Sequence, residues 1–153
     1  AMAPADQVRV LNRIIPLLAP ESPSHVSVIH NENDDLIANY ISHQFRQVGK
    51  QSQTVNGDNI ENIRPGSVLY VLPGALEKEG YQFISDRGCV TVTGYPDLVE
   101  HGHVSIGLRS TDNQRTQIIG SKESLDRAGI SLPQSFNNLV EYTDSPASYK
   151  EAS

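Results

Sequence analysis

The sequence holds one cysteine, Cys89, among its 153 residues, so an internal disulfide is excluded. Cys89 lies beside Val90 and Val92 in a strand-like segment, and we therefore expect a small buried side chain rather than a reactive thiol. Basic residues are also few: 18 acidic residues outnumber 12 basic ones, and no basic cluster exceeds an isolated pair. Proteins that bind phosphate backbones need such clusters, so we do not expect nucleic acid as a partner.

Long hydrophobic runs and several catalytic motifs are absent too. The longest apolar runs, such as 68–72, fall far short of the roughly 20 residues that cross a bilayer. No GxGxxG, GxxxxGK[ST] or G-x-S-x-G motif occurs, which removes sequence support for dinucleotide, P-loop and serine-hydrolase sites. A phosphoacceptor domain is disfavoured because the third predicted strand ends Leu72-Pro73-Gly74 without a carboxylate. We expect no cofactor, no catalytic residue and no enzyme.

What is present is an alternation of strand-like and helix-like segments. Apolar residues recur every three to four positions from Leu36 to Val48, as in an amphipathic helix, and Ser67 to Leu72 is nearly all apolar, as in a buried strand. The expected order is strand 25–30, helix 36–48, strand 51–55, helical turn 59–63, strand 67–72, helix 75–86 and strand 90–93. This alternation predicts an α/β three-layer sandwich with a mainly parallel sheet.

The segment from Val104 to Val140 predicts how the sheet closes. Residues 104–110 and 115–120 resemble two strands joined by turn residues, which predicts a C-terminal antiparallel hairpin. Ser121 has the chemistry of a helix N-cap and Gly129 that of a C-cap, and a second short helix follows residues 130–133. The sequence therefore predicts a compact closing unit with no catalytic group.

This closing segment, Ser-Lys-Glu-Ser-Leu-Asp-Arg-Ala-Gly-Ile-Ser-Leu-Pro over 121–133, followed by a short helix ending in Leu139-Val140, resembles that of YfiR-like proteins. The upstream layout from Val8 to Pro16 and into the strand 25–30 is compatible with the same family. The resemblance implies a small periplasmic regulator. With one cysteine, the chain lacks the paired cysteines that form disulfides in that family, and redox sensing is not expected.

The expected domain organisation has three parts. Because Met2 follows Ala1, residues 1–7 are interpreted as a cloning remnant or a disordered N-terminus, from which a signal peptide could have been removed. Residues 8–144 form a single YfiR-like α/β domain. The polar, aperiodic residues 145–153 are interpreted as a flexible tail.

Three loops are candidate ligand-binding sites, since ligands of open α/β sheets gather at the carboxyl ends of strands. They supply His30, Asn31 and Asn33 from the first loop, Pro73 and Gly74 from the second, and Thr93, Gly94 and Tyr95 from the third. We expect the three loops to converge. Carboxylates of the first loop (Glu32, Asp34, Asp35) would repel a phosphate or other anion.

His101 and His103, which flank Gly102 and lie near Glu100, are candidate metal ligands. On an extended segment both rings would project to one side. Two or three ligands fall short of a structural zinc set, so we favour surface histidines near a strand start and predict no metal ligands.

These observations favour a binding or regulatory domain. The YfiR resemblance implies a periplasmic domain that docks onto the sensor domain of a membrane-bound signalling protein, such as a diguanylate cyclase that makes cyclic di-GMP. The resemblance further implies that the domain inhibits this signalling protein and that an outer-membrane lipoprotein relieves the inhibition. A homodimer of the domain is compatible with this role. The alternative is a small-molecule-binding domain resembling one lobe of a transporter solute-binding protein.

Overall fold

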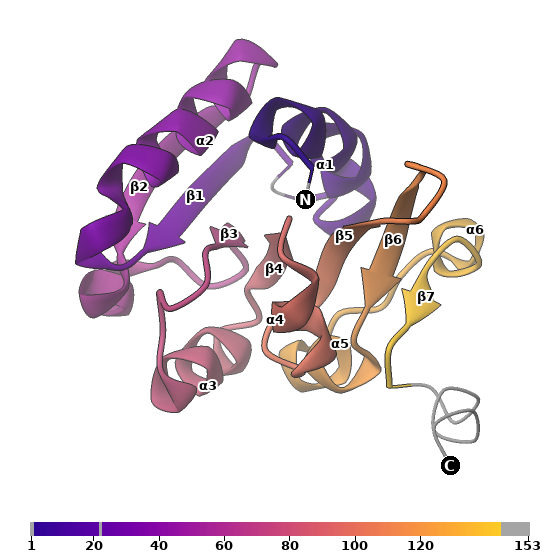
Figure 1. Cartoon of the computed structure of the whole chain (residues 1–153). Coiled ribbons are helices and arrows are strands. Elements are labelled where there is room, and N and C mark those ends of the chain that lie inside the picture. The colour runs from indigo at the N-terminus through magenta and orange to yellow at the C-terminus, as the bar shows by residue number, and fades with distance from the viewer. Residues whose placement is uncertain (1, 22, 145–153) are drawn as a thin grey trace.

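The buried segments of the chain form one seven-stranded sheet in the order β2-β1-β3-β4-β5-β6-β7 (Figure 1). The structure is a computed structural model and describes residues 2–21 and 23–144, so the tail predicted at 145–153 lies outside the described residues. The strands are β1 (His25–His30), β2 (Gln51–Asn56), β3 (Val68–Val71), β4 (Val90–Thr93), β5 (Ile106–Ser110), β6 (Thr116–Gly120) and β7 (Glu141–Tyr142). Strands β1 to β5 pair in parallel and β6 pairs antiparallel with β5, which confirms the predicted sheet and its hairpin.

Helices cover both faces of this sheet, which makes the three layers that the sequence predicts. Figure 1 shows α1 and α2 together on one side and α3 and α4 on the other, with α5 beside α3. The helices are α1 (Pro4–Leu18), α2 (Asp35–Gln47), α3 (Lys78–Asp86), α4 (Pro96–Glu100), α5 (Lys122–Ala128) and α6 (Gln134–Asn137), and the 3-10 segments are η1 (Glu32–Asp34) and η2 (Gly57–Asn62).

The central strands bury both of their faces, which explains their continuous apolar sequences. In β3, Val68 and Tyr70 pack into the cluster formed with α1 and α2, whereas Leu69 and Val71 pack into the cluster on the side of α3 and α4. Cys89 is 1% exposed just before β4, so the expectation of a buried small side chain is confirmed. The sheet thus lies between two apolar layers.

The closing segment agrees with the sequence except in its last element. The Ser121 hydroxyl accepts a hydrogen bond from the backbone N–H of Ser124, and Gly129 ends α5 in the left-handed conformation, so both caps are confirmed. The sequence did not predict β7, because a two-residue strand carries no periodic signal. None of the described helices combines the length and the apolarity that a bilayer crossing requires.

The domain begins earlier than expected. Helix α1 starts at Pro4, and Gln7 and Val8 are buried in it, so residues 4–7 are helical rather than disordered, while the interpretation of residues 1–7 as a cloning remnant stays a prediction. Proline fits the first turn of a helix because its missing N–H would have no partner there. Met2 also packs against the core.

Candidate functional site

Two of the three predicted loops meet at the carboxyl ends of β1 and β3, where a third loop from β2 joins them. Together they line an open cavity of about 450 Å³, here called the carboxyl-end hollow. Its lining consists of Asn31, Glu32, Asn33, Asn56, Gly57, Asp58, Gly74, Ala75, Leu76, Glu77, Glu79 and Gly80. Since the sheet order is β2-β1-β3-β4, the connection after β1 runs to β2 on one side and the connection after β3 runs to β4 on the other, so the strand order reverses between β1 and β3. Ligands of open α/β sheets bind at such positions.

Asparagine side chains fix the loops that follow β1 and β2. The Asn31 Oδ1 accepts a hydrogen bond from the backbone N–H of Asn33 at 2.9 Å, and the Asn56 Oδ1 accepts one from the N–H of Asp58 at 2.9 Å. Both are turns in which a side chain replaces a backbone acceptor. The same short sequence pattern therefore ends β1 and β2 in similar ways.

The loops after β2 and β3 touch through their backbones. A Cβ atom at Gly57 would lie 1.9 Å from the carbonyl oxygen of Ala75. Only glycine permits this approach, because any side chain would push the two loops apart. The side chain of Leu76 packs close to Gly57 and Gly80, and so holds the start of α3 against the same contact.

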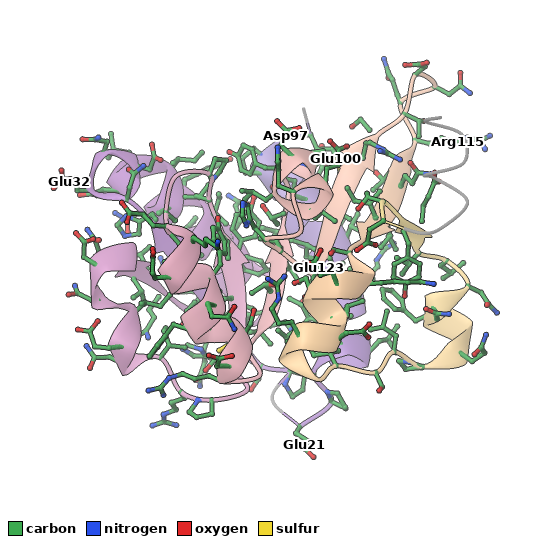
Figure 2. The ribbon with its side chains drawn as sticks, turned by 90° about the horizontal axis from the view of Figure 1, so that it is seen from below. Glu21, Glu32, Asp97, Glu100, Arg115 and Glu123 are labelled. Atoms are coloured by element: carbon green, nitrogen blue, oxygen red, sulfur yellow. The ribbon has the colours of Figure 1, made fainter. Side chains whose placement is uncertain are left out.

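The hollow is acidic. Four exposed carboxylates line it, and no lysine, arginine or histidine is among its described lining residues. The carboxylates are Glu32, Asp58, Glu77 and Glu79. Figure 2 shows Glu32 at the left edge of the molecule and Glu21, which precedes β1, at the bottom edge, well apart from it. The arrangement attracts cations and repels anions, as the sequence predicts for its first loop.

The third predicted loop, with Thr93, Gly94 and Tyr95, does not line the hollow, because α1 covers the end of β4. The hydroxyl of Tyr70 donates to the Gln7 Oε1 at 2.5 Å and accepts from the Gly94 N–H at 3.3 Å. A Cβ atom at Gly94 would lie 1.9 Å from the Gln7 Oε1. Thr93 is 0% exposed, and its hydroxyl donates to the carbonyl of Val71 at 2.8 Å. The third loop therefore does not line the hollow, although Tyr95 lies close enough to the first loop for the carboxylate of Asp34 to add to the rise that burial causes in its pKa.

The Tyr70 hydroxyl at this closed position is itself strongly buried. Burial raises the pKa of Tyr70 well above its usual range, and the nearby Tyr95 adds to the rise. A neutral phenol is required here, since it both donates to Gln7 and accepts from Gly94. The end of β4 is thus a structural junction.

The remaining predicted site residues fall into two groups, those that line the hollow and those that do not. Asn31, Asn33 and Gly74 line the hollow, whereas His30 and Pro73 do not. The His30 Nδ1 lies 2.6 Å from the carbonyl oxygen of Asn31 and 3.7 Å from the Asp35 Oδ1, which places the ring beneath the loop. His30 therefore orients the loop without facing the hollow.

The two histidines considered as metal ligands lie between α4 and β5. His103 stacks on Tyr81 with ring centroids 4.4 Å apart, and His101 lies 6.1 Å further along the stack. Burial lowers the pKa of His103, and the charges of His101 and Arg127 lower it further. Within residues 2–21 and 23–144, no group of three or more His, Cys, Asp or Glu side chains could hold a metal ion.

Sequence reasoning missed the loop after β2, with Asn56, Gly57 and Asp58, and the start of α3, with Glu77 and Glu79. A signal for the first was present: an Asn-Gly pair follows the predicted strand 51–55, and the rule that nominated the other strand ends applies equally there. The α3 glutamates carried no separate signal, because exposed acidic residues are common at helix starts.

Comparison with known proteins supports the fold. The sequence matches no known family model and no curated protein. A solved conserved domain protein from Vibrio cholerae superposes with a TM-score of 0.56 at 11% identity, covering 88% of this chain and 59% of that one. An ABC domain from Streptococcus pneumonia, solved in complex with L-Trp, gives a TM-score of 0.57 at 10% identity over 91% of this chain and 61% of that one. The chain thus spans about three-fifths of the length of these structures and shares their α/β fold.

Proposed function

We propose that this chain is a solute-binding α/β domain that takes a small ligand bearing an ammonium group in the carboxyl-end hollow. The observation that carries the proposal is the chemistry of that hollow: amide side chains of Asn31 and Asn56 beside carboxylates such as Asp58 and Glu77, with no cationic side chain in its described lining. An ammonium ion offers three N–H donors, which suit these acceptors. A phosphate or carboxylate would meet like charge.

Two further observations support binding at this position. The hollow lies outside the carboxyl ends of β1, β2 and β3, where the strand order reverses. One of the structurally similar proteins is a domain solved with L-Trp, a small molecule that carries both an ammonium group and a carboxylate, so this likeness supports binding of a small molecule and not the choice of charge. That likeness shows a shared fold and nothing more. That this chain binds a ligand of the same kind is part of the proposal.

The openness of the hollow sets the expected affinity. Its carboxylates are exposed, so water and salt weaken their attraction for a cation. For the domain alone we expect dissociation constants on the order of a millimolar. A second lobe or a partner protein that closes over the hollow would bury more of the ligand and tighten binding.

The test is a titration of the protein with two ligands of similar size and opposite charge, namely ethanolamine and glycolate, followed by NMR of the backbone amides. Ethanolamine is expected to shift the amides of residues 31–33, 56–58 and 74–77, and glycolate to leave them unchanged. The variants Asp58→Asn and Glu77→Gln should each weaken ethanolamine binding several-fold, because each removes one charge without changing shape.

Glu61→Gln is the matched control, since Glu61 is an exposed glutamate of η2 outside the lining. It changes the net charge equally and should leave binding unaltered. The proposal fails if ethanolamine shifts no amide of the hollow, or if Glu61→Gln weakens binding as much as Glu77→Gln.

A regulatory role in the periplasm is the second candidate, and one surface feature favours it. On α2, Leu36 is 87% exposed and Tyr40, one turn later, is 47% exposed. Residues four apart share a helix face, so the two side chains form a small apolar patch beside the loop of Glu32. Aromatic and aliphatic side chains of this kind anchor protein interfaces. The proposed partner is the sensor domain of a membrane-bound diguanylate cyclase, as the YfiR resemblance implies.

Binding of the domain to such a purified sensor domain would be measured by titration calorimetry, with Leu36→Ser and Tyr40→Ser as variants. We expect each variant to weaken binding by about tenfold or more. The matched control is Leu139→Ser, which removes another exposed leucine far along the chain. Equal affinity in all four proteins would refute docking through α2.

A further inference from the structure

A second cavity lies at the other end of the same strands. It measures about 410 Å³ and is here called the amino-end groove. Its lining consists of His25, Ser27, Gln51, Gln53, Asn62, Ile63, Arg64, Ser67 and Val68. It thus joins the first halves of β1 and β2 to the segment that leads from η2 into β3.

The register of the strands explains why the floor of this groove is polar. His25 pairs with Gln51 and Ser27 pairs with Gln53, and these four side chains share one face of the sheet with Ile29. Further along that face, Ile29 and Val55 belong to the apolar cluster, which Ile60 and Ile63 help to cover. The covering layer therefore ends halfway along the strands, and the polar half faces the groove.

The floor is deep rather than flat. Ser27 is only 3% exposed, although it lies next to the edge strand of the sheet. On one wall, the Ser67 hydroxyl donates to the carbonyl of Arg64 at 2.6 Å, which fixes the turn that carries the arginine. A small ligand in the groove would therefore contact this wall and the exposed side chains of Gln51 and Gln53.

The charge of the groove is opposite to that of the molecule. The protein has a formal net charge of −6, yet the described lining residues include Arg64 and His25 and no carboxylate. Among the described residues, the Arg64 guanidinium forms neither an ion pair nor a hydrogen bond, as is also true of Arg13 and Arg115, whereas Arg9 and Arg109 pair with carboxylates. An arginine left without an acid, beside the amides of Gln51, Gln53 and Asn62, offers a forked set of N–H donors.

We propose that the amino-end groove is a second binding site, specific for a small oxyanion such as a carboxylate or a phosphate ester. Arg64 binds the anion through its guanidinium, the amides of Gln51 and Gln53 donate to its remaining oxygens, and a ring N–H of His25 adds a further donor. The groove has room for a ligand larger than the anionic group itself. The site is separate from the carboxyl-end hollow and does not depend on the function proposed for it.

The test is an NMR titration with inorganic phosphate and with succinate, each followed at the backbone amides and at the side-chain amides of Gln51, Gln53 and Asn62. Saturable shifts confined to these groups and to residues 62–68 are expected at concentrations up to about 20 mM. Shifts from both probes indicate a general oxyanion site, and shifts from one probe indicate a site for that class. Absence of saturable shifts from both would overturn the proposal.

Two variants separate the site from general charge effects. Arg64→Gln should weaken binding about tenfold or more, whereas Arg13→Gln, which removes an exposed arginine of α1, should have little effect. Gln53→Glu places a carboxylate in the groove and should abolish binding with Arg64 intact, while Gln47→Glu on α2 serves as its control. Equal weakening by Arg64→Gln and Arg13→Gln would show non-specific attraction and would overturn the proposal.

Discussion

The two ends of strand β1 carry opposite chemistry. At its carboxyl end, the hollow combines amides with four carboxylates, and at its amino end, the groove combines amides with Arg64 and His25. The two cavities have similar volumes, about 450 Å³ and 410 Å³, so charge rather than size distinguishes the ligands that each could select. The net charge of −6 for the whole chain does not reveal that acidic and basic side chains are separated between these two cavities.

The two regions also differ in what builds them. Loop backbones form the hollow and touch at Gly57, whereas side chains on a sheet face form the groove. A change in backbone position should therefore damage the hollow first, and a change in one side-chain charge should damage the groove first. This difference can be tested by substitution.

The largest effect is expected from Gly57→Ala. The new Cβ would meet the carbonyl of Ala75 at 1.9 Å, so the loops after β2 and β3 must separate. Forcing an extra methyl into such a contact costs about 1–3 kcal/mol of unfolding free energy. Urea unfolding would measure the loss, and ethanolamine binding at the hollow should fall with it, while phosphate binding at the groove should persist.

The matched control for this change is Gly66→Ala. A Cβ at Gly66 would meet no atom within 4 Å, and the cost there comes only from its φ of 75°, which amounts to about 1 kcal/mol. If Gly57→Ala unfolds at the same urea concentration as the wild type, the two loops can separate without loss of stability. The hollow would then not depend on its backbone contact, and the distinction between a backbone-built hollow and a side-chain-built groove would be wrong.

The second largest effect is expected at the carboxyl end of β4, which opens into neither cavity. Tyr70→Phe removes the hydroxyl that joins Gln7 to Gly94 and leaves two buried polar groups without that partner. We expect a loss of about 1–2 kcal/mol in unfolding free energy. Faster hydrogen exchange at the Gly94 amide should accompany it. Tyr40→Phe, at an exposed tyrosine, is the control and should change neither measurement.

A smaller effect is expected from pH at the same tyrosine. Because burial raises the pKa of Tyr70 above its usual value of 10.0, the folded state holds this proton more tightly than the unfolded state. The resulting stabilisation is fully present below pH 10.0 and is lost as the pH rises beyond it. Unfolding free energies should therefore fall less steeply above that pH in Tyr70→Phe than in the wild type. Identical slopes would show that Tyr70 ionises freely in the fold.

Much of the sheet could be predicted from sequence, because strong periodicity determines both the type and the place of an element. The strand 25–30 and the hairpin agree with the structure to within two residues. Two short elements were not predicted: α4 has five residues and β7 has two, too few for a period to show. The start of the domain was missed because Pro4 opens a helix that the N-terminal composition obscured.

The candidate site was only partly predictable, for a different reason. A rule about strand ends identified Asn31, Asn33 and Gly74, and the same rule identified Thr93 and Gly94. Which of these strand ends stays open depends on tertiary packing, namely the position of Gln7 in α1, and no local pattern encodes it. The groove was missed because polar residues on an edge strand normally indicate only contact with water.

The smallest effect is expected from salt, and it bears on both cavities at once. The carboxylates of the hollow and the guanidinium of Arg64 are exposed, so mobile ions screen each of them. Raising NaCl from about 20 mM to about 500 mM should weaken ethanolamine binding and phosphate binding alike, by roughly three- to tenfold, because the Debye length shrinks several-fold. NMR titrations at both concentrations would measure the change. Binding of either probe that resists salt would show a contact dominated by buried hydrogen bonds, and the opposite charges of the two regions would then not explain their selectivity.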